Sequence, residues 1–236
     1  ILRRCEGWPA IAVAPGNLSG VETVVAPSGL VHAEEAAITN NGNTIVFVQG
    51  DEEGQDLFVT HRNGGTWSEP VLLTGDSTYR IHHWPVLSYD EQTVAFVCDN
   101  DGSDGAIGEV NLDGTGFHVV LGPADGPPGS GTAPLLAPAY APDGSLVFEA
   151  EWAGSVEIWR LPAGSSSPKQ VATSPPFNND NSPVVLPDGR IASQWWGGES
   201  EDSDLKIMGP TGQNHFLLGH GILERLGAGA LWPESR

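Results

Sequence analysis

Short apolar stretches separated by turn residues recur along the whole chain. Four segments each begin with an apolar stretch, continue through a turn centred on Asn-Gly, Asp-Glu or Asp-Gly, and end in a second stretch of alternating apolar and polar positions. This order is typical of a tight β-hairpin. The four segments are residues 36–47, 85–96, 138–148 and 183–193. We therefore expect repeated hairpins rather than long helices.

Two more strand-like segments follow each hairpin, so that each repeat contains four strands. Third strands are expected at 56–59, 106–110, 156–159 and 204–207. After a further turn, fourth strands are expected at 70–74, 117–121, 170–173 and 215–218. Four antiparallel strands per repeat are the unit of a β-propeller, in which each repeat forms one blade.

The central turns of the hairpins are regularly spaced. Their anchor residues lie 45 to 53 positions apart and are Asn41, Asp90, Asp143, Asp188 and, as a fifth copy, Glu234. The chain ends where the second strand of the fifth repeat should begin, and the N-terminal region supplies the missing strands at 1–5, 10–14 and 21–25. Complementary half-repeats favour a closed ring, because a solenoid would need a polar cap at each end.

The sequence therefore predicts an all-β fold, a single five-bladed β-propeller with four-stranded antiparallel blades over residues 1–236. A composite blade from the N- and C-terminal ends of the chain is expected to close the ring. The blades are expected near 27–75, 76–122, 133–174 and 178–219, with 220–236 plus 1–26 as the composite blade. The 31 Gly and 19 Pro agree with many short strands and tight turns.

The net charge of the chain limits the kinds of partner that it is expected to bind. Asp and Glu total 30 against 10 Lys and Arg, which gives a formal net charge of −20 at pH 7. This charge repels nucleic acid and anionic membrane surfaces, so we expect no nucleic acid and no membrane as partners. A charged partner should be cationic, although acidity can also serve solubility alone.

Other features of the composition leave the cellular setting open. No apolar run of 18 residues is present, so we expect a soluble, monomeric protein without a membrane span. The chain begins at Ile1, so an upstream segment, leader or tag could have been removed. Cys5 and Cys98 fall at equivalent positions of two repeats that are not neighbours, which favours two buried thiols over a disulfide.

The repeat resembles that of a known family. The shared pattern is His/Asn-x-x-Pro, then Ser/Pro-Asp-Gly and an apolar strand, together with the segment 56–74. It resembles the TolB-type (WD-like) β-propeller repeat over essentially the whole chain, although the first repeat lacks the Pro and the second has Tyr-Asp-Glu in place of Pro-Asp-Gly. The resemblance implies the fold and a periplasmic or extracellular location. The namesake has six blades and an additional domain, so its partner interactions are not implied here.

A site in such a propeller is expected at the central mouth. The innermost strand of each blade starts at one face, and the loop between the second and third strands returns to that face. Residues just before the inner strands should therefore line the mouth, with Leu135 and Leu136 as the contribution of the third repeat. The ligand-binding candidates are Glu34, Glu35, Arg80, His82, His83, Asp180, Asn181 and, near the same face, Trp196.

Acidic residues gather in the loops of this face, at 51–53, 99–104 and 199–204. A face of one sign of charge attracts ligands of the opposite sign. The alternative is that surface loops carry charges in any protein.

The two adjacent histidines are candidates for metal ligation or for acid–base chemistry. Either of them could act with Glu34, Glu35 or Asp180. Neighbouring residues in a strand point to opposite sides, so at most one of His82 and His83 should face the channel. Hydrogen-bonded polar filling of the mouth is the alternative interpretation.

A second metal hypothesis concerns residues 99–105, which are rich in Asp, Asn and Gly. The helix-loop-helix calcium motif needs Gly at its sixth position and Glu at its twelfth, where this sequence has Asp104 and Val110. The motif fails. We expect no required cofactor, and Ca²⁺ or another divalent metal is the alternative.

Tryptophans and one long loop offer a further hypothesis. Trp152, Trp195 and Trp196 fall near the same face, where exposed indoles could stack on sugar rings, whereas most tryptophans of a propeller lie in its core. The segment 122–134, rich in Gly and Pro, is either slack or a flap over the mouth.

These observations lead to three functional hypotheses. The first is a non-catalytic module that binds a small-molecule, peptide or protein ligand, cationic or metal-bridged, with its acidic face and central mouth. The second is a lectin or a carbohydrate-active hydrolase or lyase that binds a glycan there. The third is a structural part of a larger secreted or periplasmic protein. No local catalytic motif such as Gly-x-Ser-x-Gly is present, so the sequence leaves the enzyme question undecided.

Overall fold

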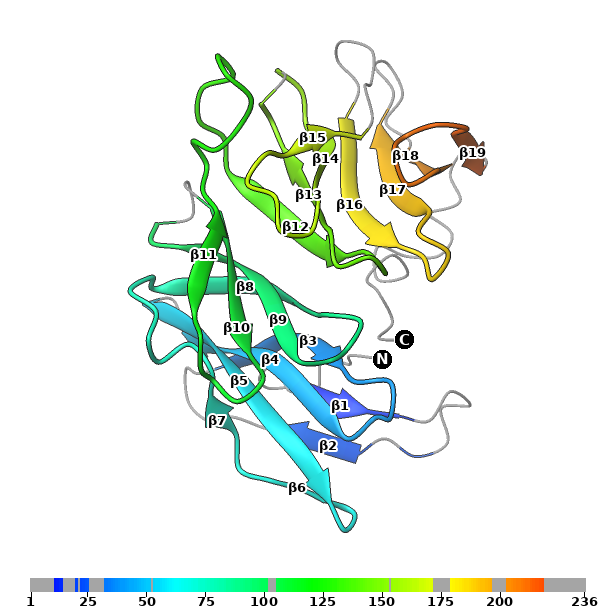
Figure 1. Cartoon of the computed structure of the whole chain (residues 1–236). Coiled ribbons are helices and arrows are strands. Elements are labelled where there is room, and N and C mark those ends of the chain that lie inside the picture. The colour runs from blue at the N-terminus through cyan, green and yellow to red at the C-terminus, as the bar shows by residue number, and fades with distance from the viewer. Residues whose placement is uncertain are drawn as a thin grey trace.

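The computed structural model of the chain describes residues 11–14, 20, 22–25, 32–51, 53–101, 105–152, 154–171, 179–196 and 203–218. These ranges form β-strands joined by turns. Figure 1 shows the sheets succeeding one another around a common centre, from blue at β1 to red at β19. Within these ranges, no helix has the length and apolar character needed to span a bilayer.

The described strands form five antiparallel sheets in chain order. The first sheet pairs β1 (Ile11–Val13) with β2 (Glu22–Val25). The next contains β3 (His32–Ile38), β4 (Thr44–Asp51), β5 (Gly54–Asn63), β6 (Thr66–Trp67) and β7 (Val71–Leu72). The third contains β8 (Ile81–Leu87), β9 (Thr93–Asp99), β10 (Ala106–Asn111) and β11 (His118–Leu121). The fourth contains β12 (Leu135–Tyr140), β13 (Leu146–Ala150), β14 (Glu157–Leu161) and β15 (Lys169–Gln170). The fifth contains β16 (Asn179–Val185), β17 (Ile191–Trp196), β18 (Ser203–Met208) and β19 (Phe216–Leu218).

The predicted four-strand repeat is confirmed in the four large sheets. Each begins with the expected hairpin and continues with the expected third and fourth strands, and β6 is a short addition in the first of them. β1 and β2 lie where the third and fourth strands of the composite blade are expected, and they pair as such strands should. The expected strand at 1–5 and the anchor Glu234 lie outside the described residues.

Apolar side chains between consecutive sheets form the core. Each cluster takes one wall from one sheet and the other wall from the next sheet in the chain. The pairs of buried residues that represent these interfaces are Ile11 and Phe47, Leu57 and Phe96, Ile107 and Phe148, and Ile158 and Ile191. Sheets that pack face to face in sequence around a centre are the arrangement of a β-propeller.

Each hairpin turn is closed by its anchor residue. The side-chain Oδ1 of the anchor accepts a hydrogen bond from the backbone N–H two residues later, at 2.8 to 3.2 Å, in Asn41, Asp90, Asp143 and Asp188. The residue after the anchor has a φ between 58° and 84° in all four turns. Glu91 adopts this conformation where the other turns have Gly, so the turn survives the change from Asp-Gly to Asp-Glu.

Each inner strand contains a bulge that the sequence analysis did not foresee. The pairing register shifts within β3, β8, β12 and β16, next to residues with a φ between 46° and 50°, which are Glu35, Trp84, Ala137 and Ser182. A proline follows three of them, and proline is accommodated at bulges because it has no N–H for the ladder. The strands continue on the N-terminal side of the bulge, so they begin three or four residues earlier than expected. The expectation that the candidate residues precede the inner strands was therefore wrong for those at 34–35, 82–83, 135–136 and 180–181, which lie within the strands.

Candidate functional site

The inner strands β3, β8, β12 and β16 contact one another in chain order. Backbone hydrogen bonds join the start of an inner strand to the start of the third strand in the preceding sheet. Gln55 N–H donates to Arg80 O at 2.9 Å, and Asp180 N–H donates to Val156 O at 3.0 Å. The starts of the inner strands and the loops after the second strands therefore lie at the same end of the molecule.

Glu34 belongs to a polar group with two residues that the sequence analysis missed. Its Oε1 lies 3.2 Å from His32 Nε2 and 3.2 Å from Gln55 Nε2, and the last two atoms are 3.1 Å apart. The side chain of Glu34 is 39% exposed, so a ligand can reach this carboxylate. Strand alternation puts residues i and i+2 on one side, and this rule could have identified His32.

Glu35 joins β3 to β8 and lies beside His83. Its Oε2 accepts the backbone N–H of Trp84 at 2.7 Å and lies 3.6 Å from His83 Nδ1. The interaction with Glu35 raises the pKa of His83 against the opposing effect of burial, and the negative charges of Glu34 and Asp99 also raise it. This carboxylate therefore favours the protonated form of His83.

His82 points to the other side of β8, into the space between two sheets. Its side chain is fully buried, with Nδ1 at 2.6 Å from Gln55 O and Nε2 at 2.9 Å from Ser77 Oγ. Because a carbonyl oxygen can only accept, Nδ1 carries the proton and the Ser77 hydroxyl donates to Nε2. Burial lowers the pKa of His82, which favours the neutral ring.

Asp180 is also fully buried. Its Oδ2 accepts from Lys206 Nζ at 2.8 Å and its Oδ1 accepts from Ser193 Oγ at 3.1 Å, so it forms an ion pair inside its own sheet. The neighbouring Asn181 is half-buried, and its Oδ1 makes no hydrogen bond within the part of the chain that the structure describes. Asn181 is thus more exposed than Asp180, but its Oδ1 is itself buried.

The last two candidates are Arg80, which contacts the group around Glu34 through its backbone O and Gln55 N–H, and Trp196. Arg80 is exposed at the start of β8, and its guanidinium donates to the backbone O of Glu53. The backbone of Trp196 ends β17, but its side chain lies outside the described residues.

The structure thus brings Glu34, Glu35 and His83 together at the corner between β3 and β8, which we call the mouth corner, with His32 and Gln55 beside them. His82 is directed away from it, and Asp180 and Asn181 belong to β16, two inner strands farther along. Within the described ranges, no group of three His, Cys, Asp or Glu side chains is arranged to hold a metal ion.

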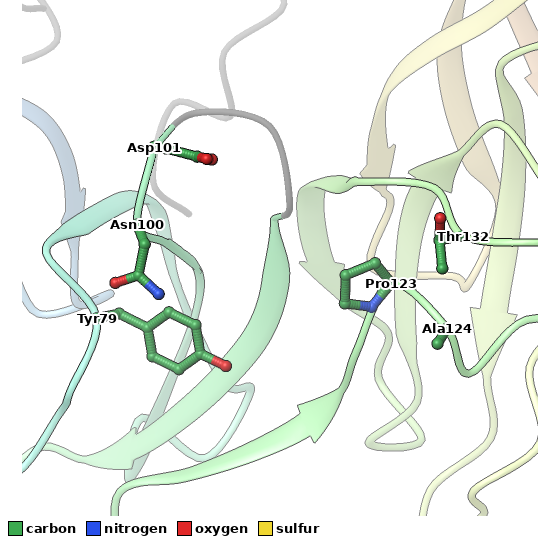
Figure 2. A pocket seen from close by; sticks show the side chains of 6 residues that line it. All are labelled: Tyr79, Asn100, Asp101, Pro123, Ala124 and Thr132. Atoms are coloured by element: carbon green, nitrogen blue, oxygen red, sulfur yellow. The ribbon is translucent and has the colours of Figure 1, made fainter.

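A cleft of about 600 Å³ opens on the same face, between residues 100–101, which follow β9, and the loop of residues 122–134. Figure 2 shows the six lining residues on two opposed walls, and the ring of Tyr79 projects across the gap. One wall is lined by Tyr79, Asn100 and Asp101, and the other by Pro123, Ala124 and Thr132.

The loop of residues 122–134 is folded onto Trp152. The backbone O of Pro123 accepts both Trp152 Nε1–H, at 3.0 Å, and Ala133 N–H, at 3.1 Å. Trp152 is buried and packs edge-on against Trp159, so the idea that it is exposed for sugar stacking was wrong. A Cβ at Gly126 would come within 2.7 Å of the Trp152 ring, so the close packing requires Gly there. The loop is therefore neither slack nor a flap over the mouth.

No protein-family model matches the chain, and no curated protein matches it either. Solved structures do match. TolB from Acinetobacter baumannii is 16% identical with a TM-score of 0.67, and the match covers 89% of this chain and 49% of that one. The putative TolB from Agrobacterium tumefaciens is 20% identical with a TM-score of 0.66, over 86% of this chain and 72% of that one.

An enzyme has the same fold. Oligogalacturonate lyase from Vibrio parahaemolyticus is 12% identical with a TM-score of 0.66, over 91% of this chain and 60% of that one. The chain spans about half of the length of the Acinetobacter protein, and at these identities the likeness concerns the fold alone. The repeats, the sheets and these matches agree that the chain has the fold of the TolB-type β-propellers.

Proposed function

We propose that this chain is a binding module that holds a cationic peptide or protein segment at the mouth corner. The observation that carries the proposal is the pair of adjacent carboxylates, Glu34 and Glu35, at the centre of the fold with side chains 39% and 22% exposed. Glu34 is the more exposed of the two, and Glu35 already lies beside the imidazole of His83, whose pKa it raises. A ligand ammonium or guanidinium would extend the same type of interaction.

The surrounding charges support this proposal. Asp51 ends the second strand of its sheet, and Glu53 and Asp101 follow second strands on the same face. The formal net charge of −20 attracts cations from a distance. Attraction of this kind raises the association rate and is screened by salt. Binding should therefore weaken as ionic strength rises.

The test measures the affinity of an oligolysine peptide by titration calorimetry at several salt concentrations. The double variant Glu34→Gln/Glu35→Gln should bind about threefold to tenfold more weakly and with less salt dependence, because exposed ion pairs contribute about 0.2–1 kcal/mol each. Glu69→Gln removes an exposed carboxylate near the outer strands and serves as the matched control. An equal loss in both variants would mean that only the net charge matters and would refute the site.

An enzyme is the competing proposal, because the fold occurs in an oligogalacturonate lyase and in a puromycin-hydrolysing peptidase from Mycobacterium tuberculosis. Glu35 and His83 would then be the acid–base pair, 3.6 Å apart. One oligogalacturonate lyase structure is a complex with manganese. Glu34 and His32 offer two ligands to a divalent metal, such as one that bridges a ligand, and a third would have to come from elsewhere.

We also propose that the propeller has five blades and that residues 220–236 and 1–10 complete the blade to which β1 and β2 belong. The repeat spacing supports the count, and β1 and β2 support the composite blade because they lack inner partners among the described strands. A periplasmic or extracellular location is a further proposal, which rests on the family resemblance of the repeat.

A further inference from the structure

We propose that the cleft between Tyr79, Asn100 and Asp101 on one side and the loop of residues 122–134 on the other is a binding site for a neutral carbohydrate, separate from the mouth corner. Its volume of about 600 Å³ lies within the range of roughly 300–1,000 Å³ that is typical of small-ligand sites. Its lining combines an aromatic ring, a prolyl ring and a methyl group with hydroxyl, amide and carboxylate groups.

The wall formed by Tyr79, Asn100 and Asp101 is held in place by its own hydrogen bonds. The buried Asp99 accepts the backbone N–H groups of Asn100 and Asp101 through Oδ1. Tyr79 N–H donates to Ser77 Oγ at 3.1 Å, and the same hydroxyl donates to His82. The wall is therefore positioned before any ligand arrives, which lowers the entropy cost of binding.

The opposite wall is equally fixed. Pro123 is held by Trp152 and Ala133, as described above, and Gly122 N–H donates to the carboxylate of Asp125 at 2.6 Å. Next to the cleft, Leu135 N–H donates to Gly105 O at 2.8 Å and so joins the two sheets that carry the walls.

The polar groups of the cleft fit a ligand with hydroxyl groups. Tyr79, Asn100 and Thr132 can each donate and accept, so ligand hydroxyls, which also do both, would match these three groups. A ligand ammonium or guanidinium group only donates, so it would leave the donor groups of these three residues unused. Among the described residues that line the cleft there is no Lys, Arg or His, and the net charge of the chain is −20, so an anionic sugar would meet repulsion without a counter-charge from them.

The test uses maltotriose and cellotriose as neutral probes and trigalacturonate as the anionic one, with saturation-transfer NMR and titration calorimetry on the full chain. At least one neutral trisaccharide should bind more tightly than trigalacturonate. Thr132→Val and Tyr79→Phe each remove one hydroxyl with little change of shape and should weaken binding about fivefold, the usual contribution of one hydrogen bond. Thr132→Ser keeps the hydroxyl and should bind like the parent chain.

Several outcomes would overturn the proposal. These are no binding of either neutral sugar, tighter binding of trigalacturonate, or unchanged sugar affinity in both hydroxyl-deleting variants. Displacement of the sugar by oligolysine, together with loss of that peptide's binding in Asp101→Asn, would mark a cation site instead. The double variant Glu34→Gln/Glu35→Gln should leave sugar binding unchanged, so failure at the mouth corner and failure at the cleft give different results.

Discussion

His82 and His83 are neighbours in the chain, yet their surroundings move their pKa values in opposite directions. His82 is buried against Gln55 O and Ser77 Oγ, and burial lowers its pKa. His83 is 30% exposed beside Glu35, which raises its pKa. The alternation of one β-strand is the cause, because it turns one ring into the core and the other toward a carboxylate.

The two histidines should therefore make opposite contributions to stability as pH changes. The pKa of His82 is lower in the folded protein than in the unfolded chain, so the unfolded chain takes up a proton first, and the contribution of His82 to stability falls as pH drops below about 6.5. His83 contributes stability that is present below about 6.5 and is lost as pH rises through its raised folded value.

NMR titration of the imidazole signals, assigned with His82→Asn and His83→Asn, should give a higher pKa for His83 than for His82. Glu35→Gln keeps an acceptor for Trp84 N–H but removes the charge, so the pKa of His83 should fall toward its ordinary value. An unchanged pKa of His83 in that variant, or the reverse order of the two histidines, would contradict this account.

At the scale of strands and turns, the repeat made much of the fold predictable from the sequence. The anchors Asn41, Asp90, Asp143 and Asp188 predicted four hairpins, because their side chains close the turns locally. The bulges were not predicted. They depend on a φ near 50° at Glu35, Trp84, Ala137 and Ser182, four dissimilar residues that carry no shared signal of their own.

The candidate site was less predictable for the same reason. The repeat pattern could place Glu34, His82, His83 and Asp180 near the inner strands. Whether each side chain is buried, however, depends on which side of the pleat it occupies. A shift of one residue in a strand exchanges the two sides. The start of each inner strand was predicted three or four residues too late, so the exposure of these side chains could not be assigned from the sequence.

Carboxylates that cross from one sheet to the next hold the inner strands in register. Glu35 does so from β3 to β8, and Glu149 does so from β13 to β16, where it accepts Ser182 N–H at 2.8 Å. Glu149 is buried, and burial raises its pKa. Such a bridge fixes the position of one sheet relative to its neighbour through a single backbone group.

Glu149→Ala should lower the free energy of unfolding by about 1–3 kcal/mol, because it leaves Ser182 N–H without its acceptor. Glu149→Gln retains an acceptor and should cost less. Urea denaturation measures both, with the exposed neighbour Glu151→Ala as the control, for which the change should stay within about 0.5 kcal/mol. Equal effects of the Ala substitutions at 149 and 151 would contradict the bridging role.

At the scale of the whole molecule, the central question is whether the two ends of the chain meet in one blade. Chain termini that lie close together tolerate circular permutation. A permuted chain with new ends between the exposed residues Ser166 and Ser167 would leave every large sheet intact, because β14 and β15 lie on either side of that cut.

We expect a permutant whose linker from Arg236 to Ile1 has about four residues to be as stable as one with about twenty, because four residues span only about 14 Å. Thermal unfolding followed by circular dichroism compares the two, and the long-linker protein is the control for the new cut site. If only the long linker gave a folded protein, the ends would not meet and the five-bladed ring would be refuted.

The bulge in each inner strand has a consequence for how such a protein can diversify. The kink is a property of the main chain, and it recurs with an acid, an indole, a methyl and a hydroxymethyl group in turn. The backbone at the bulge therefore does not depend on which side chain it carries. Side chains around the opening can be substituted one sheet at a time while the backbone of the sheets keeps its conformation.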